Sequence, residues 1–362
     1  LKDVFGNPSS LHCDGRKAKK MIDDSRALLA SLIGADASEI VFTSSGNEAT
    51  CLAIIGSAMA QSPERRKKIV VSAFEHPCGI EACRHLETLG FEIQRISPGS
   101  DGIVSPDKLA ECVEGAFLVS IMTANNVTGS VQPIAKLGEV ARSAGAIFHS
   151  DAVQAFGKIR IDLSSLPVDM MSVSAHKIYG PKGAAALFVR KGVKINPILY
   201  GGGQEKGLRP SSENVPDMVG FAKAAEICAR QMEHESKRLL EMRERLLAGL
   251  EEVVPETYLI GHRMLRLPGH LCVGFAGREG DAIRLLLALD EMGFSVSSGS
   301  ACSSNHAGAP AQALIAMGFD QFRARGSLRI SLGRFNTDKE IDRFLEFIPR
   351  AVPGLGKISS RK

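Results

Sequence analysis

Short apolar runs alternate with helix-length amphipathic stretches through the first part of the chain. The apolar runs lie at Ile40–Thr43, Lys68–Ala73, Phe91–Ile96, Phe117–Met122, Ala146–Ser150, Met170–Ser174 and Ala184–Val189. Amphipathic stretches between several of them predict helices at Asn47–Gln61, Gly79–Leu89, Ser105–Val113 and Ile134–Ser143. This alternation predicts an α/β fold with a mostly parallel seven-stranded sheet between helices.

The pattern changes after Pro216, where the chain becomes rich in Ala, Leu, Glu, Lys and Arg at helical spacing. We expect one long helix over residues 218–252. Further strands are expected at Tyr258–Ile260, His270–Phe275 and Ser327–Ser331, and helices at Asp281–Met292 and from Thr337 onward. The chain is therefore predicted to form a large domain over residues 1–232 and a smaller α/β domain over residues 233–362.

The composition excludes several classes of protein. Hydrophobic residues make up 44% of the 362 positions, which excludes a disordered chain. No apolar run reaches the roughly 18 residues of a membrane helix. The net charge of +4 is too small to predict direct nucleic-acid binding. Eight dispersed cysteines without a CxxC pair predict a reduced, cytoplasmic protein with no metal site.

Polar clusters follow the ends of several predicted strands, where ligands of open α/β sheets bind. They are Thr43–Glu48, Glu75–His76, Asn125–Asn126, Ser150–Gln154 and Ser174–Lys177. Together they would gather a carboxylate, an amine, two imidazoles and several amides on one side of the sheet. We therefore expect a binding or catalytic site there.

Asp151 ends a strand of buried character, so its carboxylate needs a partner. It could be a metal ligand, a helix cap or the partner of a pyridinium nitrogen. An Asp and a Lys on neighbouring strand ends, here Asp151 and Lys177, are what pyridoxal phosphate (PLP) chemistry needs. The strand-to-helix turn at Gly46 and Asn47 suits a phosphate, although an ordinary helix cap has the same pattern.

Two residues near the C-terminus are candidates for other roles. Cys302 lies among Ser, Gly and Ala residues, so we expect an exposed, nucleophilic thiol on a mobile loop. Arg329 lies in an apolar strand, where an Arg is either paired or bound to a ligand carboxylate. The glycine-rich residues 201–212 could be a phosphate clamp, a subunit contact or a flexible turn.

At these residues the sequence resembles the NifS-like (IscS-like) cysteine desulfurases, of the class V aminotransferase group of fold type I PLP enzymes. The motifs that carry the resemblance are Phe42–Glu48, Asp151–Gln154, Ser172–Gly183 and Ser297–Ser303. The likeness runs from Phe5 to Phe335, nearly the whole chain. The last motif is similar to that of the long-loop group, in which the cysteine lies in a mobile segment.

The resemblance implies how PLP would be held. Lys177 would form the Schiff base, Asp151 would pair with the pyridinium nitrogen, and His76 would stack on the ring and handle the proton of the substrate thiol. Gln154 and Asn126 would contact the phenolic oxygen and the substrate side of the site.

The resemblance also implies a phosphate site. Its members would be Ser174, His176 and the Gly46-Asn47 turn. Asn47 stands where the family usually has Thr, which removes one hydroxyl but keeps the backbone N–H. Ser212 stands where the family has a Thr that reaches the phosphate of the other subunit, which implies a homodimer.

The implied activity is conversion of L-cysteine to L-alanine. Arg329 would bind the substrate carboxylate, and Cys302 would take the sulfur as a persulfide and pass it to an acceptor such as an iron–sulfur scaffold protein. A selenocysteine lyase would use the same residues and stays open as an alternative. So does a PLP-fold protein that has lost catalysis and serves as a binding partner, whereas a transaminase would have no use for the cysteine loop.

Overall fold

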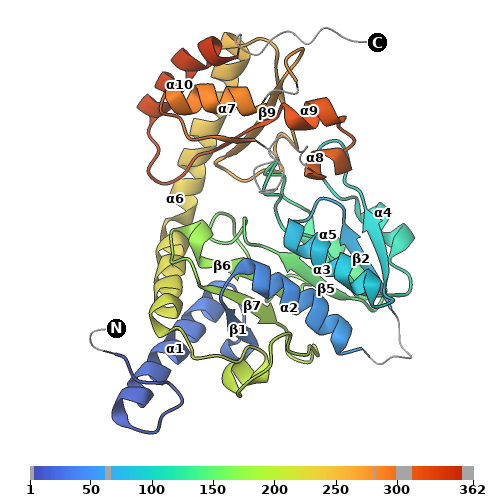
Figure 1. Cartoon of the computed structure of the whole chain (residues 1–362), viewed down its shortest axis with the longest axis vertical. Coiled ribbons are helices and arrows are strands. Elements are labelled where there is room, and N and C mark those ends of the chain that lie inside the picture. The colour runs from blue at the N-terminus through green and yellow to red at the C-terminus, as the bar shows by residue number, and fades with distance from the viewer. Residues whose placement is uncertain (1–3, 62–66, 280–281, 299–311, 353–362) are drawn as a thin grey trace. The chain divides into compact units, whose positions relative to one another are not determined.

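The computed structural model describes residues 4–61, 67–279, 282–298 and 312–352 (Figure 1). The chain divides into two compact units. The first holds Leu1–Ile96, Ser105–Thr123 and Pro133–Met232, and the second holds Ser97–Val104, Ala124–Gln132 and Glu233–Lys362. Two short segments, Ser97–Val104 and Ala124–Gln132, therefore belong to the second unit although their neighbours in the sequence belong to the first.

The first unit is built on a seven-stranded sheet. Its strands are β1 (Ile40–Thr43), β2 (Lys68–Ser72), β3 (Glu92–Ile96), β4 (Ala116–Ser120), β5 (Ile147–Asp151), β6 (Met170–Ser174) and β7 (Ala185–Val189), in the order β1-β7-β6-β5-β4-β2-β3. Strand β7 runs antiparallel to both its neighbours, β1 and β6, and every other pair is parallel. The predicted mostly parallel seven-stranded sheet is confirmed.

The central strands are apolar because both their faces are covered. All residues of β4 and β6 are buried, which explains their continuous apolar runs. Strand β3 ends the sheet and exposes Glu92, Gln94 and Arg95, as a polar edge strand does.

The helices of the first unit are α1 (Cys13–Leu32), α2 (Gly46–Met59), α3 (Pro77–Thr88), α4 (Pro106–Cys112) and α5 (Ile134–Ser143), with short 3₁₀ turns η1 (Ala37–Glu39), η2 (Ala175–Ile178) and η3 (Gln204–Gly207). Helix α1 was not predicted from the apolar pattern. Its buried side includes Ala18, Ile22, Ser25 and Leu29. Because two of these side chains are small or polar, the apolar periodicity of α1 is weak.

Helix α6 (Val215–Val253) is one continuous helix that starts in the first unit and ends in the second. The second unit has an antiparallel sheet of β8 (Thr257–Leu259), β9 (His270–Phe275), β10 (Ser297–Ser298) and β11 (Leu328–Ser331), in the order β10-β11-β9-β8. Its other helices are α7 (Ala282–Glu291), α8 (Gln312–Ala316), α9 (Gln321–Arg325) and α10 (Asp338–Ala351). The core of this unit joins α6, α7 and α10 to β9 and β11.

Candidate active site

Three strands of the first unit end at the same edge of its sheet. Strands β1 and β6 are both antiparallel to β7, so they run in the same direction, and β5 is parallel to β6. Thr43, Asp151 and Ser174, their last residues, therefore lie at one edge. The sheet thus brings together polar side chains that are far apart in the sequence.

Helix α2 begins against these strand ends, and Gly46 makes the approach possible. A Cβ on Gly46 would lie 2.6 Å from Val153 Cγ2 and 3.6 Å from the Cβ of Ser174. Any side chain at Gly46 would therefore collide with the turn that follows Asp151. The close approach places the backbone N–H groups of the first turn of α2 next to that turn.

The N-terminus of α2 is held by its own side chains. The Ser45 hydroxyl caps the helix by accepting from the Glu48 N–H at 3.1 Å. Glu48 accepts from the Ser44 N–H at 3.0 Å and from Arg209 Nε at 2.9 Å. Burial opposes the charged form, but the hydrogen bonds from Arg209 and Ser44 outweigh it and hold the pKa of Glu48 below its ordinary value. A rigid helix start of this kind suits an anion.

Asp151 is a buried carboxyl, 5% exposed. Its Oδ1 accepts from the Val153 N–H at 2.8 Å. Burial raises the pKa of Asp151 to about 6, although the Val153 hydrogen bond and the Lys177 charge both act to lower it. The carboxyl is therefore ionised in most molecules at pH 7, and a cationic partner would further stabilise the ionised form.

His76 caps helix α3, because its Nδ1 accepts from the Cys78 N–H at 3.3 Å. Burial, and after it the charge of Lys177, lower the pKa of His76. The ring is therefore neutral at pH 7, which suits it to stack on another ring.

Glu75, next to His76, is a member of this cluster that the sequence analysis left without a role. It is buried and accepts from the Met122 N–H at 2.8 Å. Burial, with a further contribution from the charge of Asp151, raises the pKa of Glu75 well above its ordinary value. Its place directly before His76 at a strand end was the signal that could have drawn attention to it.

Lys177 lies in η2, immediately after β6, and is exposed together with His176. The hydroxyl of Ser174 and Nδ1 of His176 are 2.8 Å apart. Partial burial of the ring lowers the pKa of His176, and the Lys177 charge lowers it further. Because the Lys177 charge acts on Asp151, His76 and His176, the structure brings these four groups together.

Two predicted substrate residues lie in the second unit and contact each other. Arg329, on β11, donates from Nη1 to the carbonyl oxygen of Asn126 at 3.0 Å. Asn126 lies within a turn that Asn125 Oδ1 holds by accepting from the N–H groups of Val127 and Thr128 at 2.9 Å each. Arg329 is thus paired with a backbone carbonyl. Cys302 lies outside the described residues.

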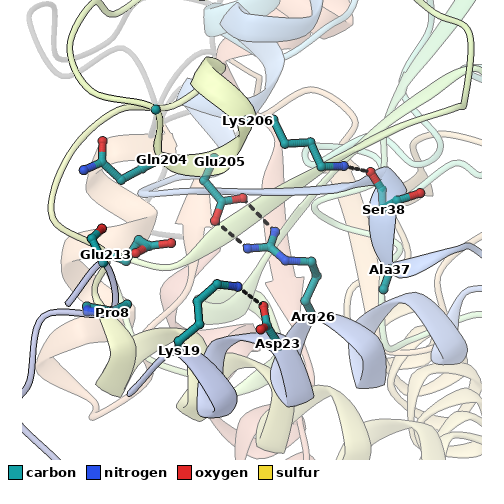
Figure 2. A pocket seen from close by; sticks show the side chains of 12 residues that line it. Pro8, Lys19, Asp23, Arg26, Ala37, Ser38, Gln204, Glu205, Lys206 and Glu213 are labelled. Atoms are coloured by element: carbon teal, nitrogen blue, oxygen red, sulfur yellow. Dashed lines mark hydrogen bonds and ion pairs between the residues drawn. The ribbon is translucent and has the colours of Figure 1, made fainter. Parts of the chain in front are cut away.

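The glycine-rich residues 201–212 are tied to α1 and β1 of the first unit. Arg26 and Glu205 form a bidentate ion pair in a pocket of about 610 Å³, with N–O distances of 2.6 and 2.7 Å. Figure 2 shows the two side chains pointing toward each other. Glu205 also accepts from the Phe42 N–H at 2.8 Å. This pairing, across 179 positions, has no signal in the local sequence. The centre of the segment is therefore not a flexible turn, whereas Ser212 near its end is exposed.

Over residues 4–61, 67–279, 282–298 and 312–352, no helix is long and apolar enough to cross a membrane. The same ranges contain no group of three or more His, Cys, Asp or Glu side chains that could hold a metal ion.

Comparisons with known proteins agree on one family. The family model "Aminotransferase class-V" matches residues 1–344. A cysteine desulfurase IscS from Methanosarcina thermophila is 42% identical over 99% of this chain and 88% of its own length. A cysteine desulfurase from Nostoc is 43% identical over 100% of this chain and 90% of its own length. A NifS-like protein from Rickettsia africae has a structure with a TM-score of 0.86 at 32% identity, over 97% of this chain and 93% of that one.

Proposed function

The chain belongs to the class V aminotransferase family and is a cysteine desulfurase, and from this premise we propose which residues carry the conversion of L-cysteine to L-alanine. One observation carries the proposal. The charge of the Lys177 amine acts on the buried carboxyl of Asp151, and the turn that follows Asp151 packs against Gly46 at the N-terminus of α2.

Enzymes of this family depend on PLP, and the residues present fit that cofactor. PLP has a basic ring nitrogen, an aldehyde and a phosphate. The cluster offers a buried carboxyl whose charged form a cation would stabilise (Asp151), an amine (Lys177) and a capped helix start. When bound, PLP supplies an electron sink that stabilises negative charge at the α-carbon of the substrate.

Lys177 is proposed as the residue that attaches to the cofactor aldehyde and, once the substrate has displaced it, moves the proton of the substrate α-carbon. Asp151 would keep the ring nitrogen protonated, and burial strengthens this pairing because the carboxyl is shielded from water. The neutral His76 ring would stack on the cofactor and accept the proton of the substrate thiol. Gln154 would contact the phenolic oxygen.

The phosphate is assigned to the start of α2, through the backbone at Gly46 and Asn47, and to Ser174 and His176 of the same unit. The hydrogen-bonded Ser174–His176 pair and the capped helix start support this assignment. Ser212 would reach the phosphate bound by a second copy of the chain, so the enzyme is proposed to act as a homodimer.

In the second unit, Arg329 would bind the substrate carboxylate and Asn126 the substrate side of the cofactor. The Cys302 thiolate would attack the substrate sulfur. A new S–S bond forms on Cys302 while the bond between sulfur and the β-carbon breaks, and its electron pair goes to the carbon. An acceptor protein, such as an iron–sulfur scaffold, would then take the sulfur from the persulfide.

A reducing, cytoplasmic location is part of the same proposal. No disulfide joins any two of the seven cysteines within the described residues, which supports it.

The experiment that tests this function is measurement of alanine from L-cysteine, with PLP and a thiol reductant present to clear the persulfide. The wild-type protein should form alanine and sulfide in equal amounts. Lys177→Ala should form none and should lack the visible absorption of the bound cofactor, whereas Lys182→Ala should retain both. A visible band that persists in Lys177→Ala would overturn the assignment of Lys177.

A further inference from the structure

Lys158 is a charged residue close to the proposed cofactor site that the mechanism above does not use. Its Nζ donates to Oε1 of Gln154 at 3.1 Å. The two residues are four positions apart in a helical turn after β5, where i and i+4 side chains lie on the same face. The amide of Gln154 therefore points its oxygen at an ammonium group.

The turn that carries the pair is rigid. The N–H of Phe156 donates to the Ala152 carbonyl at 2.8 Å, and the N–H of Lys158 donates to the Ala155 carbonyl at 3.0 Å. Phe156 is buried, and its ring meets the ring of Phe221 edge-on at 6.0 Å between centroids. The backbone from which Gln154 and Lys158 project is thus fixed by the core of the first unit.

Lys158 is able to donate at neutral pH. Burial, and after it the charge of Lys177, lower the pKa of Lys158 to about 8, and the Cys228 thiol on α6 acts weakly in the other direction. A group with this pKa still carries its proton in most molecules at pH 7. The Lys158 charge also acts on His176, so the amine lies among the groups of the proposed site.

We propose that Lys158 is a positioning residue that holds the Gln154 amide with its NH₂ toward the cofactor, so that Gln154 acts only as a hydrogen-bond donor. An amide has one acceptor oxygen and one donor NH₂ group. With the oxygen turned to the Lys158 ammonium, the NH₂ is the group left to meet a ligand. Its partner must be an acceptor, and the ionised phenolic oxygen of the cofactor is one. The proposal rests on the proposed function, because it takes Gln154 as a cofactor contact.

This arrangement has a spectroscopic consequence. A hydrogen bond donated to the phenolic oxygen stabilises its negative charge and lowers the pKa of the Lys177–cofactor adduct, which is read from its visible band. Loss of the donor should raise that pKa by about 0.5–1 unit. Removal of the Lys158 charge also raises this pKa directly. A single substitution at Lys158 therefore does not separate its direct electrostatic effect from its effect through Gln154.

A double-mutant cycle separates them. The visible band of the PLP-loaded protein is titrated with pH in wild type, Lys158→Met, Gln154→Ala and the double variant. If Lys158 acts through Gln154, the shift in the double variant is clearly smaller than the sum of the single shifts. Additive shifts overturn the proposal, because Lys158 then acts by its charge alone.

Two further variants complete the test. Lys182→Met removes an exposed ammonium of the same neighbourhood without touching Gln154, and it should leave the pKa of the band within about 0.2 unit. Gln154→Glu leaves Lys158 intact but replaces the donor by an acceptor, so the pKa should rise; an unchanged pKa overturns the proposal even if Lys158→Met does not fold. A wild-type protein with no visible band would instead overturn the proposed function itself.

Discussion

Gly46 packs so closely against Val153 that position 46 has no room for a side chain: a Cβ on Gly46 would lie 2.6 Å from Val153 Cγ2. The first residue of α2 and the turn after Asp151 belong to segments 107 positions apart (153 minus 46). Their contact joins the proposed phosphate site to the proposed ring site.

Gly46→Ala is therefore expected to push α2 away from the turn. Overpacking of this kind costs about 1–3 kcal/mol of stability, and we expect PLP affinity, measured from the visible band, to fall about tenfold as the phosphate site shifts. The double variant Gly46→Ala/Val153→Ala should recover much of the affinity, because it removes the colliding methyl groups. Gly79→Ala, whose new Cβ would lie 3.5 Å from its nearest neighbour, is the matched control and should bind PLP normally. A Gly46→Ala variant with wild-type affinity would contradict the close contact.

The buried Asp151 predicts a pH-dependent stability of the apo protein. Its pKa is raised from 3.8 to about 6, so the folded state holds the proton more tightly than the unfolded state. Such a group contributes stability below pH 3.8, and that contribution is lost as the pH rises through 6. Asp151→Asn keeps an oxygen for the Val153 N–H and removes the charge.

In apo protein, Asp151→Asn should therefore be more stable than wild type at pH 8, by up to about 3 kcal/mol. This difference in stability between Asp151→Asn and wild type should become smaller as the pH falls to 4.5. Urea unfolding at several pH values measures it. A gap that does not change between pH 4.5 and 8 would show that the Asp151 carboxyl is not desolvated in the folded protein.

Removal of one partner of the Arg26–Glu205 pair should strongly destabilise the first unit. The two side chains are 14% and 1% exposed, and removal of one partner leaves the other charge buried. We expect Arg26→Ala to cost about 3–5 kcal/mol. Lys19→Ala breaks the Lys19–Asp23 pair, which lines the same pocket (Figure 2). The side chains of Lys19 and Asp23 are 50% and 51% exposed.

That exposed pair is the matched control, and its loss should cost less than about 1 kcal/mol. Chemical denaturation of both variants compares the two costs. Equal costs would mean that Glu205 finds another partner or water once Arg26 is gone.

Cys302→Ser should still bind PLP and react with L-cysteine, but it should not accumulate a protein persulfide. Mass spectrometry after a single exposure to L-cysteine, without reductant, reads the added sulfur. Cys13→Ser is the matched control, because Cys13 is the exposed thiol among the described cysteines, and it should accumulate persulfide as wild type does. The thiols of Cys78, Cys83 and Cys272 are poor nucleophiles, since burial raises the pKa of each. Persulfide in Cys302→Ser would mean that another thiol takes the sulfur.

Much of the sheet could be predicted because its signal is local. Met170–Ser174 and Ile134–Ser143 have the predicted bounds, since a strand covered on both faces and a helix covered on one leave distinct apolar patterns. Helix α1 escaped prediction because its buried side uses small and polar residues such as Ala18 and Ser25. Helix α1 is buried on one side by packing against the rest of the first unit, although its sequence lacks a clear apolar periodicity.

The sequence by itself determined the element types, the strand ends that carry Asp151 and Lys177, and the motifs of the cysteine desulfurases, because periodicity and motif spacing are properties of neighbouring residues. Only the tertiary structure decided which of these residues meet. Arg26 reaches Glu205 alongside the outer strand β1, and Gly46 reaches Val153 just beyond the ends of β1 and β5, because folding brings together segments that are far apart in the chain. The pKa values of Asp151 and Lys158 likewise depend on burial, which many residues far apart in the chain create together.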